Sequence, residues 1–122
     1  MMIDDRRHTR VPVSLYAELI ADDEVLPAFV TSISENGLML DSLAILSHRR
    51  SERLQIQISL PGEDDPLWIV GDVVRDERGL LFNDTAIRFV SMAKAHWRAL
   101  RRWVRLRELI LTTQPSRLRD AA

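Results

Sequence analysis

Short alternating segments follow one another along the first ninety or so residues, at a spacing of roughly ten residues. The clearest runs from Leu54 to Leu60, where every second residue is aliphatic and the residues between are Gln or Ser. A period of two buries one face of a strand and leaves the other face in water. A series of such strands with turns between them predicts an all-β protein, either a barrel or a sandwich.

The predicted strands and turns can be given as ranges. Strands are expected at residues 13–20, 25–33, 38–41, 54–60 and 67–75, with one or two more within 80–90 that are broken near Asn83 and Asp84. Turns are expected at 21–24, 61–66 and 76–79, and residues 42–53 form a polar connector. The sequence therefore predicts six or seven antiparallel strands in one small barrel.

A helix is predicted to follow, from about Met92 to Leu111, with Ser91 as its N-cap. Lysine and arginine side chains share one side, and apolar side chains cover about half of the wheel, more than the roughly 100° that a single docking face needs. Docking on the barrel alone would leave large side chains such as Trp103 and Ile110 in water, so we expect the helix to pack half on the barrel and half on a second copy or another protein. Arg107 falls inside the apolar arc, so it should reach solvent or pair with an acid.

The composition limits the class of protein. A chain of 122 residues is enough for one domain with one core, and we assign residues 12–111 to it, residues 1–11 to a flexible basic arm and residues 112–122 to a frayed tail. There is no Cys, the arm lacks the apolar core of a signal peptide, and no apolar run reaches the roughly 18 residues of a membrane span. These features predict a cytoplasmic protein.

Catalytic and metal chemistry are not expected. The three His residues lack the spacing of metal ligands, and the chain has no glycine-rich phosphate loop and no nucleophile elbow. The net charge of −1 argues against a nucleic-acid coat protein. Nine Lys or Arg and one acid lie between Arg88 and Arg119, and a solvated helix face is the simpler interpretation, so nucleic acid is an unlikely partner.

Two short motifs carry a more specific signal. Arg6 and Arg10 form an R-x-x-x-R pattern, and Ser32 to Gly37 reads Ser-Ile-Ser-Glu-Asn-Gly, a polar hairpin turn in which Gly37 can supply a positive φ. The pair resembles the PilZ family, whose marks are R-x-x-x-R followed by [D/N]-x-S-x-x-G. Ser34 and Gly37 fit the second motif, and Ser32 stands where the family has Asp or Asn.

The resemblance extends over about residues 5–107. Residues 67–75 look like the family's x-G-x-V-V-R strand, and residues 86–89 look like its G-V-R-F strand, with Ala86 in place of the usual Gly. It implies a small β-barrel with a C-terminal helix that is a receptor for cyclic di-GMP. The family has no catalysis and relays the messenger to a partner in motility, pili, exopolysaccharide synthesis or virulence.

The resemblance also implies a set of ligand-binding residues, which are Arg6, Arg7, Arg10, Ser32, Ser34 and Gly37. Guanidinium groups make paired hydrogen bonds to phosphate oxygens and to the guanine edge, and they stack on purines. The Ser34 hydroxyl could donate to a phosphate, stabilise its own turn, or do both.

Ser32 weakens this prediction. A serine cannot make the two-point contact of Asp or Asn, and a lost charged hydrogen bond costs about 1.5–3 kcal/mol, or about ten- to a hundredfold in affinity. The alternative is therefore an interaction module that kept the barrel and lost the nucleotide. Some members of the family with degenerate motifs act in this way.

Overall fold

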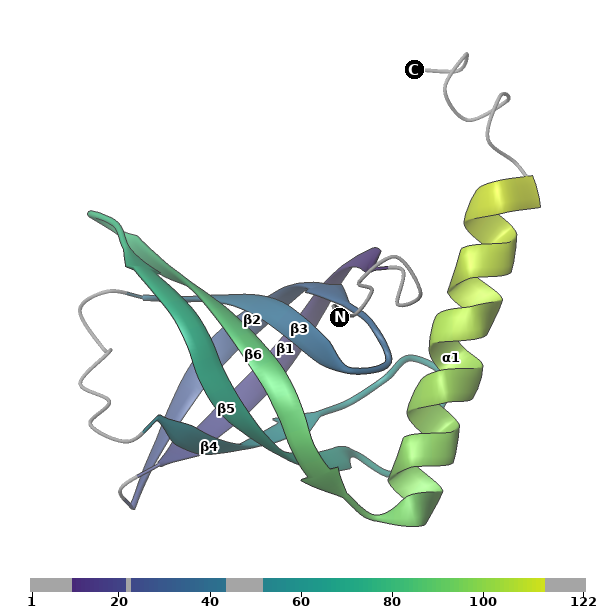
Figure 1. Cartoon of the computed structure of the whole chain (residues 1–122), viewed down its shortest axis with the longest axis horizontal. Helices are drawn as coiled ribbons and strands as arrows, with labels where there is room; N and C mark the ends of the chain where they lie inside the picture. Colours follow the sequence, from purple (N-terminus) through teal and green to yellow (C-terminus); the bar gives the residue numbers. More distant parts are fainter. Residues whose placement is uncertain (1–9, 22, 44–51, 114–122) are drawn as a thin grey trace, which may run out of the picture.

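The computed structural model describes residues 10–21, 23–43 and 52–113, and in this part of the chain six strands precede one helix (Figure 1). The elements are β1 (Val11–Ala21), β2 (Glu24–Ile33), β3 (Gly37–Leu43), β4 (Arg53–Ile58), β5 (Leu67–Arg78), β6 (Phe82–Met92) and α1 (Lys94–Thr113). Residues 1–9 of the predicted arm and residues 114–122 of the predicted tail lie outside the described residues.

The strands close into a barrel in the order β1-β2-β3-β6-β5-β4, and every pair is antiparallel. Closure comes from β1, which pairs with β2 on one side and with β4 on the other. A closed barrel leaves no unpaired strand edge along its wall. The predicted all-β antiparallel barrel with a C-terminal helix is confirmed.

The first strand starts earlier than its sequence suggests. Val11 is buried and pairs with Ile33, so it belongs to the barrel and not to the predicted arm. At the other end of the chain, α1 continues to Thr113, two residues into the predicted tail. In both cases pairing or helical bonding extends an element through residues that carry no clear periodic pattern.

The expected break at Asn83 and Asp84 is wrong, because β6 runs through both residues. Asn83 pairs with neighbours on β3 and β5, and its Oδ1 accepts a bond from the Gly79 N–H at 3.4 Å. Its partner strand β5 extends to Arg78, through most of the predicted turn. Asn83 and Asp84 are of types that favour turns. Pairing with strands on both sides nevertheless holds them in an extended conformation.

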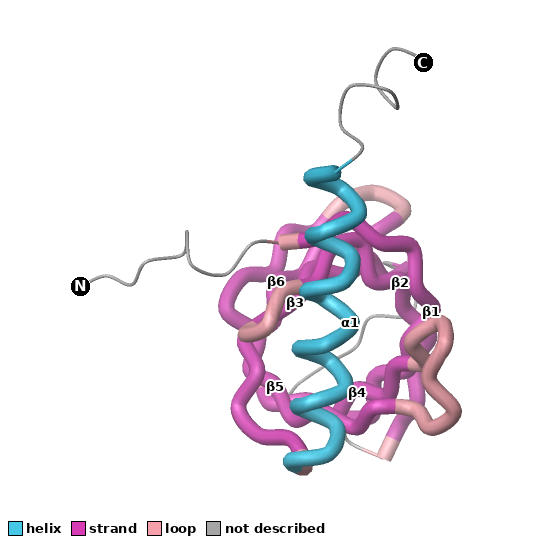
Figure 2. Tube along the Cα trace, turned by 90° about the vertical axis from the view of Figure 1, so that its right-hand side faces the viewer, coloured by secondary structure: helices cyan, strands magenta, loops and turns pink. Residues whose placement is uncertain are grey.

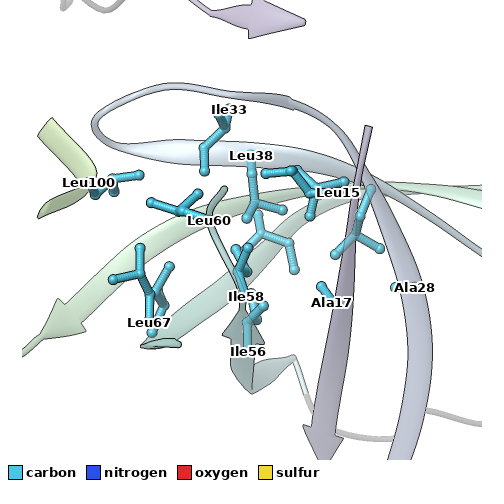
Figure 3. Close-up of a cluster of buried hydrophobic side chains, with 14 of the residues drawn as sticks. Leu15, Ala17, Ala28, Ile33, Leu38, Ile56, Ile58, Leu60, Leu67 and Leu100 are labelled. Atoms are coloured by element: carbon cyan, nitrogen blue, oxygen red, sulfur yellow. The ribbon is translucent and has the colours of Figure 1, made fainter. Parts of the chain in front are cut away.

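The inward side chains form one hydrophobic core, which is aliphatic apart from Trp103 of the helix. At one end of the barrel, Ile33 and Leu60 lie beside Leu100 of the helix (Figure 3). This end is formed by the start of β1, the β2–β3 turn, the β4–β5 connection and the end of β6.

Helix α1 crosses this open end of the barrel (Figure 2). Leu100 and Val104 are completely or almost completely buried, and Trp103 is only 8% exposed, with its Nε1–H donating to the Pro61 carbonyl oxygen at 3.2 Å. The expectation that Trp103 lies in water is therefore wrong, because its ring is part of the hydrophobic core. Ile110, further along the helix, is 49% exposed as expected.

The start of the helix also differs from the prediction. Ser91 lies within β6, and α1 begins at Lys94, so the serine is not the N-cap. Arg107 is exposed, and its guanidinium carbon lies 4.8 Å from the centroid of the Trp103 ring. This geometry is a cation–π contact, so Arg107 covers the ring that closes the barrel. No helix of the described residues is long and apolar enough to cross a membrane.

We predict that Leu100→Ala lowers the free energy of unfolding by about 2–5 kcal/mol, because it opens a cavity where the helix enters the barrel. Leu80→Ala is the matched control, since this side chain is 99% exposed and its loss should change stability by less than about 0.5 kcal/mol. Urea denaturation followed by circular dichroism measures both. Equal effects of the two changes would show that the helix does not contribute to the core.

Candidate functional site

The β2–β3 turn is held by its own polar groups. The Ser34 N–H donates to the Gly37 carbonyl oxygen at 2.9 Å, and the Ser34 Oγ lies 2.7 Å from Asn36 Oδ1. The same Oγ accepts a bond from the Asn36 N–H at 3.3 Å. Ser34 is 1% exposed, so in this structure its hydroxyl stabilises the turn, the simpler of the two roles expected for it.

Gly37 is required for a reason other than the one inferred from sequence. It does not adopt a positive φ. A Cβ at this position would lie 2.5 Å from the Ile87 carbonyl oxygen of β6, which no real side chain tolerates. Next to it, the Phe89 N–H donates to the Asn36 carbonyl oxygen at 2.9 Å. The turn is therefore packed directly against the backbone of β6.

The pairing of β1 with β2 brings the two sequence motifs together. Val11 pairs with Ile33 and Pro12 with Ser32, so Arg10, which directly precedes β1, lies next to the β2–β3 turn. Arg10 is exposed and Ser32 is partly exposed. Both strands carry a bulge close to this rim, as strands at barrel rims often do. Arg6 and Arg7 lie outside the described residues.

Helix α1 contributes two arginines that sequence analysis did not assign to the site. Arg101 Nε lies 3.2 Å from Glu35 Oε1, and Arg105 Nε lies 3.9 Å from Glu35 Oε2. Glu35 belongs to the turn itself, between Ser34 and Asn36. The row of arginines was visible in the sequence, but only the docking of the helix shows that it faces this turn.

A hollow of about 400 Å³ lies along the same face of the helix. Among the described residues it is lined by Arg98, Arg101, Arg102, Arg105 and Leu106. Arg102 also pairs with Glu63 of the β4–β5 connection, at 3.2 Å. Four of these five lining residues are arginines, so the charged groups around the hollow are basic.

A second hollow, of about 260 Å³, lies beside the β4–β5 connection and has acidic walls. It is lined by Glu63, Asp64, Asp65, Leu67, Ala95, His96, Ala99 and Arg102. The His96 Nδ1 accepts a bond from the Trp68 N–H at 3.2 Å, which gives this ring a structural role. Within the described part of the chain, no group of acids and histidines could hold a metal ion.

Two carboxyl groups on the barrel wall have shifted pKa values. Hydrogen bonding to Arg53 lowers the pKa of Asp72, whose oxygens lie 2.8 and 3.0 Å from guanidinium nitrogens of Arg53. Burial, together with the neighbouring Asp84 on β6, raises the pKa of Asp41. Both lie along the outer wall and not in the β2–β3 turn, so they contribute to the charge of the wall.

Comparison with known proteins gives a family match. A family model described as the PilZ domain matches residues 4–106, which includes both motifs and every strand. A search of curated protein sequences found no match to this chain.

Solved structures with the same fold include three named proteins. The Bacillus subtilis inhibitor of motility MotI/DgrA has a TM-score of 0.73 at 21% identity, over 88% of this chain and 52% of that chain. The PilZ domain of YcgR from Escherichia coli, solved with c-di-GMP, has a TM-score of 0.70 at 15% identity, over 91% of this chain and 97% of that chain. PlzA from Borreliella burgdorferi, also solved with c-di-GMP, has a TM-score of 0.58 at 15% identity, over 86% of this chain and 52% of that chain. The chain thus spans about half the length of MotI/DgrA and of PlzA.

We predict that Gly37→Ala destabilises the protein by about 1–3 kcal/mol, because the added methyl group meets the rigid backbone of β6. Ser14→Ala, at an exposed position of β1, is the control and should stay within about 0.5 kcal/mol of the parent. Chemical denaturation measures the difference. If Gly37→Ala is as stable as Ser14→Ala, the close approach of the turn to β6 is not a constraint.

Proposed function

Since this chain belongs to the PilZ family, we propose that it is a receptor for cyclic di-GMP. One observation supports this most strongly: the register of β1 with β2 places Arg10 at the same rim as the Ser34–Gly37 turn. The two motifs are more than twenty residues apart in sequence, and the fold makes them neighbours. The YcgR and PlzA structures, both solved with c-di-GMP, support the same ligand.

The proposed ligand residues have different roles, which follow from their side-chain chemistry. Arg10, with Arg6 and Arg7 upstream, would clamp phosphate and guanine groups through paired hydrogen bonds. The Ser32 side chain and the turn formed by Ser34 and Gly37 would line the floor beneath the ligand. No cofactor beyond this nucleotide and no catalytic residue is proposed.

The proposed role is that of a relay. The receptor would act in the cytoplasm and pass the level of the messenger to a protein partner. A motility system is one candidate, since the structurally similar MotI/DgrA is named an inhibitor of motility. Pilus assembly, exopolysaccharide synthesis and virulence are the other systems in which such a partner could lie.

We predict that isothermal titration calorimetry detects binding of cyclic di-GMP to the purified protein. Arg10→Ala and Arg6→Ala should each abolish it, because each removes a paired guanidinium contact. Arg78→Ala is the matched control, since Arg78 is exposed at the opposite end of the barrel and should leave affinity unchanged. Ser32→Asp should tighten binding by about tenfold or more by restoring a charged acceptor.

The same titration separates the receptor from its alternative. Absence of binding at high micromolar ligand would remove the receptor and favour a nucleotide-independent interaction module. Two observations favour that alternative: Ser32 replaces an acidic or amide residue, and the Ser34 hydroxyl is already engaged within its own turn. Unchanged affinity of Ser32→Asp would show that Ser32 is not the weak contact.

We also propose that the protein forms a homodimer through the C-terminal part of α1. Leu106, Leu109 and Ile110 share one stripe of the helix and are each about half exposed. A stripe of this kind can pair with its own copy across a two-fold axis, the commonest closed arrangement of soluble homo-oligomers.

Light scattering across micromolar concentrations should therefore give a mass that rises toward twice that of the chain. Leu106→Glu should keep the protein monomeric, because it places a charge in the stripe. Leu80→Glu, at the far end of the barrel, is the control and should dimerise normally. A parent protein that stays monomeric throughout this range would contradict the dimer.

A further inference from the structure

Four arginines gather on one face of α1, at Arg98, Arg101, Arg102 and Arg105. Positions three, four and seven residues apart lie on the same side of a helix, within roughly 10 Å along its axis. Like charges at this spacing repel one another and destabilise a helix. Such a cluster is therefore most stable when anions lie beside it.

The barrel supplies only part of the negative charge. Glu35 pairs with Arg101 and Arg105, and Glu63 pairs with Arg102. In the described part of the chain, two carboxylates form ion pairs with these four guanidinium groups, so the positive charges of the cluster exceed its paired negative charges by two. Arg98 has no ion pair with a carboxylate of the described residues and lines the hollow directly.

The position of Glu35 links this charge to the proposed ligand. Glu35 is part of the turn that also contains Ser34 and Gly37, and Arg10 starts β1 at the same rim. A phosphodiester ligand held there by Arg10 would lie close to the helix arginines. A cyclic dinucleotide carries two phosphates of one negative charge each, which matches the excess of positive charge.

We infer that Arg98, Arg101 and Arg105 of α1 bind a phosphate group of the ligand and that Glu35 occupies Arg101 and Arg105 until the ligand displaces it. The inference rests on the proposed receptor function and extends its site to the helix. Displacement costs little, because partly exposed ion pairs of this kind contribute little to stability. Ligand binding would also release the contact between the turn and α1, which passes the signal to the helix.

Calorimetric titration of the full chain with cyclic di-GMP tests this directly. The double variant Arg98→Gln with Arg105→Gln should bind about ten- to a hundredfold more weakly. Glu35→Gln should bind more tightly than the parent, because it removes the competing carboxylate. Arg78→Gln and Glu77→Gln make matched charge changes at the opposite end of the barrel and should leave affinity within about twofold.

The outcomes separate this inference from the receptor proposal. If Arg10→Ala abolishes binding while the helix double variant binds as the parent does, the receptor stands and the role of α1 is overturned. If Glu35→Gln raises the affinity for cyclic di-GMP no more than Glu77→Gln does, the Glu35 carboxylate does not compete with the ligand. If the parent protein binds no cyclic di-GMP, both proposals fail together.

Discussion

The insertion of Leu100, Trp103 and Val104 into the open end of the barrel organises the rest of this molecule. A closed barrel satisfies the backbone of its wall but leaves an apolar opening at each end. Here the helix covers one opening, and the Trp103 indole is fixed by a hydrogen bond to Pro61. The other sides of the same helix carry the arginines, of which Arg101, Arg102 and Arg105 reach carboxylates at the rim of the barrel.

The second constraint is the close contact between the β2–β3 turn and the backbone of β6. Gly37 allows the approach, and the Phe89 N–H fixes it through the Asn36 carbonyl oxygen. With the turn held in this way, Glu35 pairs with Arg101 of the helix, and Arg10 lies next to the turn. Three segments far apart in sequence therefore share one rim, which brings Arg10 and the arginines of α1 to the polar β2–β3 turn.

Much of the fold could be predicted because the strands alternate and the helix is amphipathic. The errors fall where pairing overrides local preference. Asn83 and Asp84 favour turns but are held in β6 by strands on both sides, and Ser91, a good N-cap by type, is still paired within β6. The width of the apolar arc on the helix did not reveal that Trp103 would enter the barrel.

The candidate site was predicted only in part, for a physical reason. The turn and the Arg10 motif are local patterns that a sequence can show. The pairing of Glu35 with Arg101 and Arg105 depends on where the helix docks, which no local pattern encodes. The role of Gly37 likewise depends on a carbonyl oxygen fifty residues away, that of Ile87.

A crystal structure of the protein with cyclic di-GMP tests most directly whether this rim is a single ligand site. The expected result is a nucleotide seated over the β2–β3 turn, with phosphate oxygens within hydrogen-bond distance of Arg10 and of at least one arginine of α1. Glu35 should then have moved away from Arg101 and Arg105. A nucleotide bound elsewhere on the barrel, with the Glu35 ion pairs intact, would contradict the claim that this rim is the ligand site.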